Sequence, residues 1–193
     1  MIKVAIFASG SGTNAVNLSN YFQNNSSISI DRIYSNNPNA GIIGKSKDLG
    51  LDCRVFARNE WLDGTITSEL KERNTDFIIL SGFLWLVPLD MISNFKNKII
   101  NIHPALLPKY GGKGMYGMKV HENVIYDKES ESGITVHLVN EEYDKGEILL
   151  QKKITVDRHD SPADLASKIH DLEYKFFPVT VEKYINDRIK KGR

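Results

Sequence analysis

The stretch IKVAIFASGSGTNA, residues 2–15, decides the fold of this chain. Its first half, residues 2–8, is a short apolar run rich in β-forming residues and predicts a buried strand. A glycine-rich loop follows at once, and a helical pattern then extends to about Phe22. Strand, glycine loop and helix in direct succession are typical of a doubly wound α/β sheet, in which ligands bind beyond the carboxyl ends of the strands.

The glycine-rich loop has the properties of an anion site. Gly10 and Gly12 allow the backbone to bend sharply and to expose its N–H groups. Thr13 or Asn14 is expected to cap the following helix, whose positive end attracts an anion. The loop also satisfies the dinucleotide-binding pattern, but that pattern expects an acidic residue after the second strand. The second strand is expected over about residues 28–34, and Ser35-Asn36-Asn37 follow it. We therefore favour a phosphate monoester over NAD, and a tight turn that binds nothing is the simpler alternative.

Later segments complete the expected sheet. Residues 76–81, DFIILS, are near-continuously apolar, which is typical of a parallel strand that is buried on both faces. Residues 132–140 and 147–156 predict two strands joined by a hairpin-like return without a helix, and therefore an antiparallel pair. The expected fold class is α/β, with an open, mostly parallel, doubly wound (Rossmann-like) sheet and an antiparallel edge near the C-terminus.

The helices are expected between these strands and at the C-terminal end. Helical spacing is present over residues 61–73 and about 118–127, and in the second of these His121 is expected on the outer surface. The last helix is expected to begin near Ser161, and Pro178 is expected to bend or interrupt it.

Composition and charge limit the function classes. The 193 residues, 41% hydrophobic and 25% charged, predict one globular domain over residues 1–193. A formal net charge of +1 gives no overall basic field, which argues against a nucleic-acid partner. The single cysteine, Cys53, excludes an intramolecular disulfide framework and fits the cytoplasm. No apolar run approaches the roughly 20 residues of a membrane span, so we expect a soluble protein. We also expect a monomer or a homodimer.

A second stretch, KIINIHPALLPKY at residues 98–110, brings two polar side chains to a strand end. If residues 99–102 form a buried strand, Asn101 and His103 point the same way at its carboxyl end, because residues two apart share a face. Pro104 ends the strand there. An amide that can donate to a developing oxyanion, beside an imidazole that exchanges protons near neutral pH, suits acyl or formyl transfer. The alternative is a capped strand end with a hydrogen-bonded histidine.

Two acidic residues further along the chain are candidates for the same chemistry. Asp144 lies in the turn EEYDKG, and a carboxylate beside His103 would favour the charged imidazolium and raise its pKa. Glu173 falls at the edge of the apolar stripe of the last helix, where it needs a cation or a donor, such as a substrate ammonium. His170 lies three residues before it. The alternatives are a turn aspartate before Gly146 and a solvated helix border.

Two loops have ligand-binding character. Residues 81–88, SGFLWLVP, place bulky apolar residues after a glycine at a strand end, where they could wall a flat ligand such as a pterin. A plain core connection explains them equally well. The glycine-rich residues 111–117 predict a mobile or tightly turned loop and a possible lid. Arg58 follows a short third strand expected over residues 53–56 and could meet an anionic group, although a solvated arginine is the commoner case.

Five motifs, in their order and spacing, together resemble the phosphoribosylglycinamide formyltransferase family of purine biosynthesis across essentially the whole chain. They are FASGSGTN, SGF, NIHPALLPKYGG, SGITVHLVNEEYDKGEILLQ and EYKFFP. The resemblance implies a formyltransferase fold with a phosphate-binding half over about residues 1–100 and a catalytic and folate-binding half over about residues 101–193.

The resemblance also implies roles for individual residues. The family's active-site Asn, His and Asp fall on Asn101, His103 and Asp144. The substrate phosphate would be held by Gly12, Thr13 and Asn14. The ribose and glycinamide end of the substrate would be reached by His170 and Glu173. The folate would lie along Leu84, Trp85, Leu86, Val87, Asn101, Asn140, Glu141, Glu142, Tyr143 and Asp144.

The implied reaction is transfer of the formyl group of 10-formyltetrahydrofolate, as a co-substrate, to the amine of glycinamide ribonucleotide, with no metal. Two alternatives remain open at this point. One is another folate-dependent formyltransferase or a formyltetrahydrofolate hydrolase, both of which share the Asn, His and Asp but normally carry a further domain. The other is a non-catalytic nucleotide-binding module.

Overall fold

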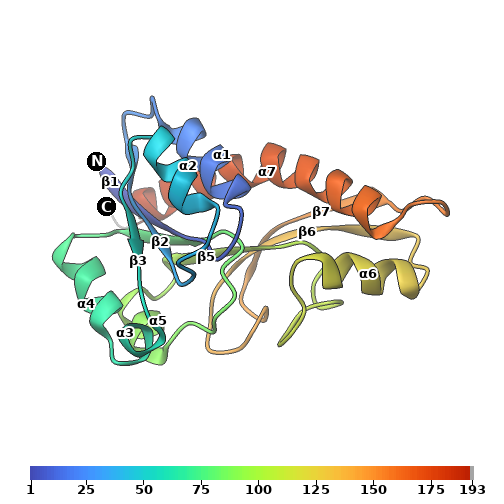
Figure 1. Cartoon of the computed structure of the whole chain (residues 1–193). Coiled ribbons are helices and arrows are strands. Elements are labelled where there is room, and N and C mark those ends of the chain that lie inside the picture. Colours follow the sequence, from blue (N-terminus) through green and yellow to red (C-terminus); the bar gives the residue numbers. More distant parts are fainter. Residues whose placement is uncertain (192–193) are drawn as a thin grey trace. The chain divides into compact units, whose positions relative to one another are not determined.

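The computed structural model describes residues 1–191 and divides into two compact units, Met1–Asn101 and Ile102–Arg193 (Figure 1). The first unit carries five parallel strands in the order β3-β2-β1-β4-β5. They are β1 (Ile2–Phe7), β2 (Ile28–Ser35), β3 (Cys53–Val55), β4 (Phe77–Leu80) and β5 (Ile99–His103), whose last two residues begin the second unit. In the second unit, β6 (Glu131–Leu138) and β7 (Ile148–Thr155) pair antiparallel. The predicted fold class is therefore confirmed.

Helices cover both faces of the parallel strands. In Figure 1, α1 (Thr13–Phe22) and α2 (Ile42–Asp48) lie on one side. On the other side lie α3 (Arg58–Leu62), α4 (Thr65–Glu72) and α5 (Leu89–Asn94). Strands that are covered on both faces must be apolar throughout, which explains why Val4–Ala8 and Ile78–Ile79 are fully buried. In the second unit, α6 (Met118–Tyr126) packs against α7 (Pro162–Lys191).

Two helix predictions were wrong in detail, and one of the two alternatives predicted for Pro178, interruption of the helix, was also wrong. The segment expected as one helix over residues 61–73 is two helices, because Gly64 adopts a left-handed conformation, with φ 85°, between α3 and α4. The N-cap of α1 is Gly12 and no side chain caps it, so neither Thr13 nor Asn14 has that role. Pro178 does not interrupt α7, since Phe177, Val181 and Ile185 around it are fully buried and their packing outweighs the lost hydrogen bond.

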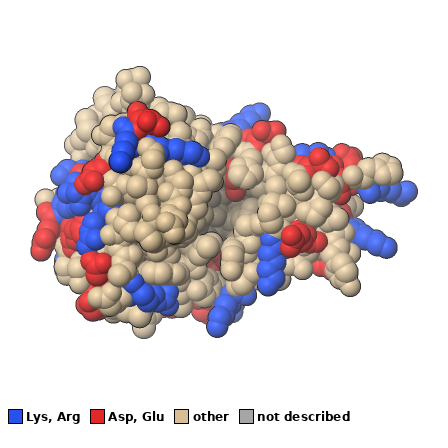
Figure 2. All heavy atoms as spheres, viewed as in Figure 1, with Lys and Arg blue, Asp and Glu red and all other residues tan. Residues whose placement is uncertain are grey.

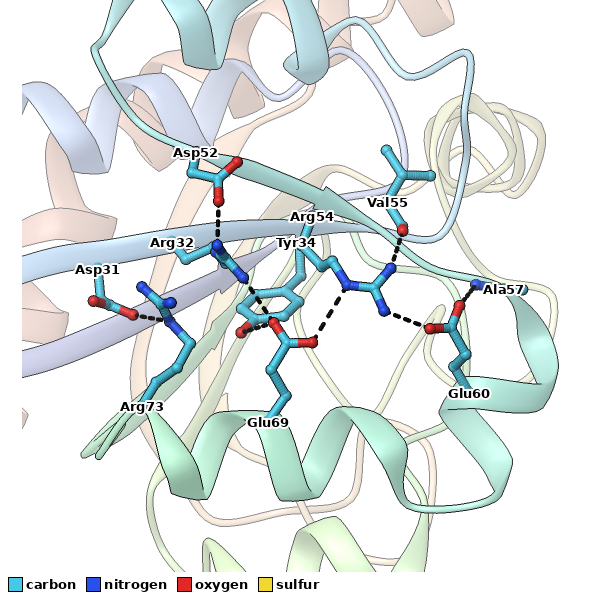
Figure 3. A network of polar contacts seen from close by, with 10 residues as sticks. All are labelled: Asp31, Arg32, Tyr34, Asp52, Arg54, Val55, Ala57, Glu60, Glu69 and Arg73. Atoms are coloured by element: carbon cyan, nitrogen blue, oxygen red, sulfur yellow. Dashed lines mark hydrogen bonds and ion pairs between the residues drawn. The ribbon is translucent and has the colours of Figure 1, made fainter.

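A polar network joins α4 to the strands β2 and β3 (Figure 3). The carboxylate of Glu69 accepts hydrogen bonds from Arg32 at 2.8 Å, from the Tyr34 hydroxyl at 3.0 Å and from Arg54 at 3.3 Å. Arg32 also pairs with Asp52, and Arg54 with Glu60. Burial, followed by the Glu69 charge, raises the pKa of Tyr34. One carboxylate on α4 thus satisfies two half-buried guanidinium groups and a buried hydroxyl.

Replacing Glu69 with glutamine is expected to destabilise the fold by about 1–2 kcal/mol, because two arginines lose a charged acceptor. The three side chains keep some exposure, so the effect stays below that of a fully buried ion pair. Urea unfolding at pH 7 measures it, with Glu72→Gln, an exposed residue on the same helix, as the control. Equal stability of the two variants would show that the network contributes nothing.

Candidate active site

The carboxyl end of β5 carries Asn101 and His103, as predicted. The strand ends at His103, and Pro104 follows it. Asn101 is half-buried, whereas His103 is 4% exposed. The next residues are held by Thr135 of β6, whose hydroxyl donates to the Ala105 carbonyl at 2.7 Å and accepts from the Leu107 N–H at 3.1 Å. The irregular segment after the strand is therefore fixed by buried hydrogen bonds.

The structure brings His103 and Asp144 together, with 3.6 Å between His103 Nδ1 and Asp144 Oδ2. A second histidine, His137 of β6, approaches the same carboxylate, with 3.5 Å between its Nε2 and Asp144 Oδ1. The Gly112 N–H also donates to Asp144 Oδ2 at 2.8 Å. All four groups belong to the second unit. The carboxylate thus lies between two buried imidazoles and a backbone donor.

The other ring nitrogens of the two histidines decide their tautomers. His103 Nε2 lies 2.7 Å from the Tyr110 carbonyl, and His137 Nδ1 lies 2.7 Å from the Leu138 carbonyl. A carbonyl only accepts, so each of these two nitrogens carries a proton. In the neutral His103 ring the other nitrogen, Nδ1, therefore turns a lone pair toward Asp144. A proton taken up on His103 Nδ1 would lie between the ring and the carboxylate. It would replace the repulsion between the lone pair and Asp144 with an ion pair.

The pKa values of the cluster are shifted in ways that agree with this arrangement. Burial lowers the pKa of His103, and the neighbouring Asp144 and the Tyr110 carbonyl oppose that shift without reversing it. As expected, Asp144 acts to raise the pKa of His103. Burial lowers the pKa by more, so the net shift is downward. For Asp144, burial raises the pKa, but the contacts with His137, His103 and Gly112 lower it below its usual value. The carboxylate is therefore ionised at neutral pH.

The predicted phosphate loop lies in the first unit, between β1 and α1. Gly12 has φ 71°, and a Cβ there would lie 2.5 Å from side-chain carbons of Ile42, so only glycine fits. Lys45 donates to the Ser11 carbonyl at 2.9 Å and brings a positive charge to the loop. No side chain caps α1, and the positive end of that helix favours an anion. These features fit a phosphate group.

The segment predicted to contact folate in the first unit presents apolar side chains. Leu84 is 43% exposed and Leu86 39%, whereas Val87 is buried. The backbone is partly engaged, because the Leu84 N–H donates to Ser9 Oγ at 3.1 Å and the Leu86 carbonyl accepts from Trp61 at 2.9 Å. The remaining backbone groups and the two leucines are thus the parts of this segment that can meet a ligand.

The other predicted folate segment is the turn between β6 and β7. Asn140 closes this turn, since its side chain accepts from the Glu142 N–H at 3.1 Å and donates to the Lys145 carbonyl at 3.2 Å. Glu141 and Glu142 are exposed, and Tyr143 is half-buried. Asp144 has a positive φ of 56°, which turns its carboxylate out of the hairpin and back toward β6.

Glu173 lies inside the buried stripe of α7 rather than at its edge. The stripe repeats every four residues and consists of Leu165, Ile169, Glu173, Phe177, Val181 and Ile185. The Glu173 carboxylate is 3.9 Å from Nδ1 of the half-buried His170. A carboxylate in an otherwise apolar stripe is costly unless a cation or a hydrogen-bond donor meets it.

His121 is buried, at 4% exposure, and the prediction that it lies on the outer surface was wrong. The buried arc of α6 includes Val120, His121 and Val124, because α7 packs against this side of the helix. Burial, with smaller effects from His170 and His103, lowers the pKa of His121 to about 4. The ring is therefore neutral at pH 7, and its Nδ1 has no hydrogen-bond partner among the residues described.

His121 is expected to make the protein sensitive to acid. Its pKa is about 4 when folded and 6.5 as the ordinary value, so the unfolded chain binds the proton more tightly. The contribution of neutral His121 to the free energy of unfolding is then fully present above about pH 6.5. It falls by up to about 3 kcal/mol as the pH approaches 4. His121→Leu should remove most of that loss in urea unfolding followed from pH 7 to pH 4.5, whereas His159→Asn, at an exposed position, should not. Parallel curves for wild type and His121→Leu would contradict the assignment.

Within residues 1–191, no group of three histidine, cysteine or acidic side chains is placed to hold a metal ion. No helix in the same part of the chain is long and apolar enough to cross a membrane.

Comparison with known proteins first gives the class. Residues 2–181 match the family model described as formyl transferase, which covers nearly the whole of both units. A match over more than half of the chain shows the class, so the chain is a formyl transferase by family.

The particular family follows from individual relatives. Phosphoribosylglycinamide formyltransferase of Bacillus subtilis is 30% identical, over 100% of both chains. The chloroplastic enzyme of the same name from Arabidopsis thaliana is 37% identical over 97% of this chain and 67% of its own length. The crystal structure of the Anaplasma phagocytophilum protein of that name superposes with a TM-score of 0.87, at 31% identity, over 96% of this chain and 88% of the other. The chain belongs to the phosphoribosylglycinamide formyltransferase family, and the resemblance seen in its motifs is confirmed.

Proposed function

We propose that this chain transfers the formyl group of 10-formyltetrahydrofolate to the amine of glycinamide ribonucleotide, a step of purine biosynthesis. The family membership supports the reaction. The observation that carries it to particular residues is the 3.6 Å approach of His103 and Asp144, from two segments 41 positions apart in the chain. This pair combines a proton-exchanging ring with a carboxylate that stabilises its charged form.

Asn101, His103 and Asp144 have distinct roles in this proposal. When the amine attacks the formyl carbon, the carbonyl oxygen becomes an oxyanion, and the Asn101 amide donates a hydrogen bond to it. The amine nitrogen must lose a proton, which His103 accepts as its imidazolium is stabilised by Asp144. The imidazolium then supplies a hydrogen bond to the oxyanion and a proton to the departing folate nitrogen, directly or through water.

The Tyr110 carbonyl controls when His103 can act. It accepts from His103 Nε2 at 2.7 Å, so this N–H reaches an oxyanion only after the hydrogen bond to Tyr110 is broken. Tyr110 immediately precedes the glycine-rich residues 111–117, and Gly112 binds Asp144. Movement of this loop would therefore release the His103 N–H, which supports its proposed role as a lid.

Different residues are proposed to bind the phosphate end and the glycinamide end of the substrate. Gly12, Thr13 and Asn14 lie at the start of α1, where an uncapped helix and Lys45 favour a phosphate. Glu173 and His170 supply a buried carboxylate and a ring for the glycinamide and ribose. The folate is assigned to Leu84–Val87 and to the turn formed by residues 140–144. Residues 1–193 act as one formyltransferase domain in this proposal.

The setting of the enzyme is also part of the proposal. On the face drawn in Figure 2, basic and acidic side chains are interspersed, which supports small-molecule substrates rather than a nucleic acid. The single cysteine supports a reducing compartment such as the cytoplasm. We propose a monomer or a homodimer.

A spectrophotometric assay with 10-formyl-5,8-dideazafolate and glycinamide ribonucleotide tests the reaction. Deformylation that requires the amine substrate is the expected result. Deformylation at the same rate without the amine would indicate a hydrolase instead. Absence of deformylation by a folded protein would overturn the proposal.

A further inference from the structure

Tyr110 joins the buried ring of His103 to the C-terminal end of α6. Its carbonyl accepts the hydrogen bond from His103 Nε2 at 2.7 Å. Its hydroxyl donates to Asp127 Oδ2 at 2.8 Å, and Glu129 Oε1 lies 3.1 Å away as a second acceptor. Asp127 is the C-cap of α6, and Glu129 follows two residues later. The backbone of Tyr110 thus contacts the ring, while its side chain contacts a pair of carboxylates.

Residues 111–126 form an excursion of the chain that begins and ends at this contact. They comprise the glycine-rich loop and α6, and the chain returns at Asp127. The Tyr110 hydroxyl therefore ties the two ends of the excursion together. Lys109 supports the tie, since its ammonium donates to Glu129 Oε1 at 2.7 Å and lowers the pKa of that carboxyl.

The backbone of Tyr110 has an uncommon conformation that the hydroxyl contacts help to hold. Its φ is 55°, in the left-handed region that bulky side chains adopt rarely. A residue keeps such a conformation where its surroundings hold it on more than one side. The segment has a second anchor, because the Gly112 N–H donates to Asp144 at 2.8 Å. Loss of the hydroxyl contact alone would therefore loosen the Tyr110 carbonyl without releasing the carboxylate.

We propose that the Tyr110 side chain is a latch, whose hydrogen bonds to the end of α6 set how firmly the Tyr110 carbonyl masks the N–H of His103. This inference rests on the proposed function, in which that N–H must leave the carbonyl to reach the oxyanion. Tyr110 is then a positioning residue, since it acts on the reaction only through His103. Only molecules with a free N–H are competent at the oxyanion step, and the latch keeps their fraction small.

Removal of the hydroxyl alone tests the latch. Tyr110→Phe should accelerate exchange of the His103 Nε2 proton with water about three- to tenfold, the effect of losing one hydrogen bond to a charged acceptor that is partly exposed. NMR of protein with isotope-labelled histidine, at pH 7 and without substrates, measures this exchange, and the signal is assigned by its absence in His103→Asn. Because no turnover is needed, the measurement tests the latch even if the protein does not transfer the formyl group.

Steady-state kinetics tests the consequence for the reaction. Tyr110→Phe should raise kcat by up to the same factor and leave KM for both substrates unchanged, because the freed N–H acts on the oxyanion and not on the bound substrates. A general loss of structure would instead lower kcat or raise KM. Asp127→Asn keeps the shape of the nearer acceptor but removes its charge, so it should change exchange and kcat in the same direction by less.

Tyr126→Phe is the matched control, because it removes the hydroxyl of a tyrosine that ends α6 and is 83% exposed. It should change neither exchange nor kinetics. An unchanged exchange rate in Tyr110→Phe would overturn the inference. Faster exchange with an unchanged or lower kcat would also overturn it, because the hydrogen bond between the carbonyl and His103 would then not limit the reaction.

Discussion

Replacing Asn101 with alanine is expected to lower kcat by about a hundredfold to a thousandfold, with a much smaller change in KM for either substrate. Loss of a single hydrogen-bond donor to a developing oxyanion has effects of this size, because the interaction is stronger in the transition state than in the ground state. Asn101 is half-buried at the end of β5, two residues before His103. Because the proposed hydrogen bond is made to the oxyanion, its loss should lower kcat rather than raise KM.

Steady-state kinetics on folded protein measures this loss, with stability checked by urea unfolding. Asn94→Ala is a suitable control, because Asn94 is an exposed asparagine whose amide bonds only the Asp90 carbonyl of its own helix. If Asn101→Ala turned over substrate at the wild-type rate, Asn101 would not be the oxyanion donor.

The parts of the fold that depend on local patterns were predictable. The apolar run of β1, the apolar residues of β4 and the proline after His103 each fix an element without reference to distant residues. The same holds for the start of α7, where the Ser161 and Asp164 side chains and backbones bond each other as the sequence predicts.

The histidines show where sequence patterns were insufficient. His137 lies in β6, where alternation would expose every second residue, but residues 132–138 are all buried. The available signal was a histidine in a strand that is buried on both faces. The alternation of apolar and polar residues instead indicated that one face of the strand is exposed. His121 was misplaced for a similar reason, since α6 is buried over a wider arc than its valines indicate.

The approach of Asp144 to His103 also lay beyond local patterns. Nothing in the turn EEYDKG distinguishes a catalytic carboxylate from an ordinary turn aspartate. The β6–β7 pairing and the positive φ of Asp144 bring the carboxylate back to the buried rings. The turn made Asp144 a candidate beside the simpler alternative of a turn aspartate, and the family resemblance then implied its role.

Replacing Asp144 with asparagine is expected to lower kcat by at least about a hundredfold at neutral pH. An asparagine amide can donate to the lone pair on His103 Nδ1, which the carboxylate now faces at 3.6 Å. It would satisfy the neutral ring and occupy the position at which the proton is to be accepted. The variant should therefore fold, and His103 should remain neutral throughout turnover.

The pH profile tests this explanation against a purely structural one. Burial already lowers the pKa of His103, and Asp144 is the first of the groups that oppose that shift. Without the carboxylate the pKa of His103 falls further, so the neutral ring that accepts the proton persists to a lower pH, and the ascending limb of kcat against pH should move toward acid. Glu147→Gln, which removes an exposed acid just after this turn, should leave both rate and profile unchanged. A loss of rate in Asp144→Asn with an unshifted profile would mean that Asp144 positions the loop through Gly112 and does not act through the ring.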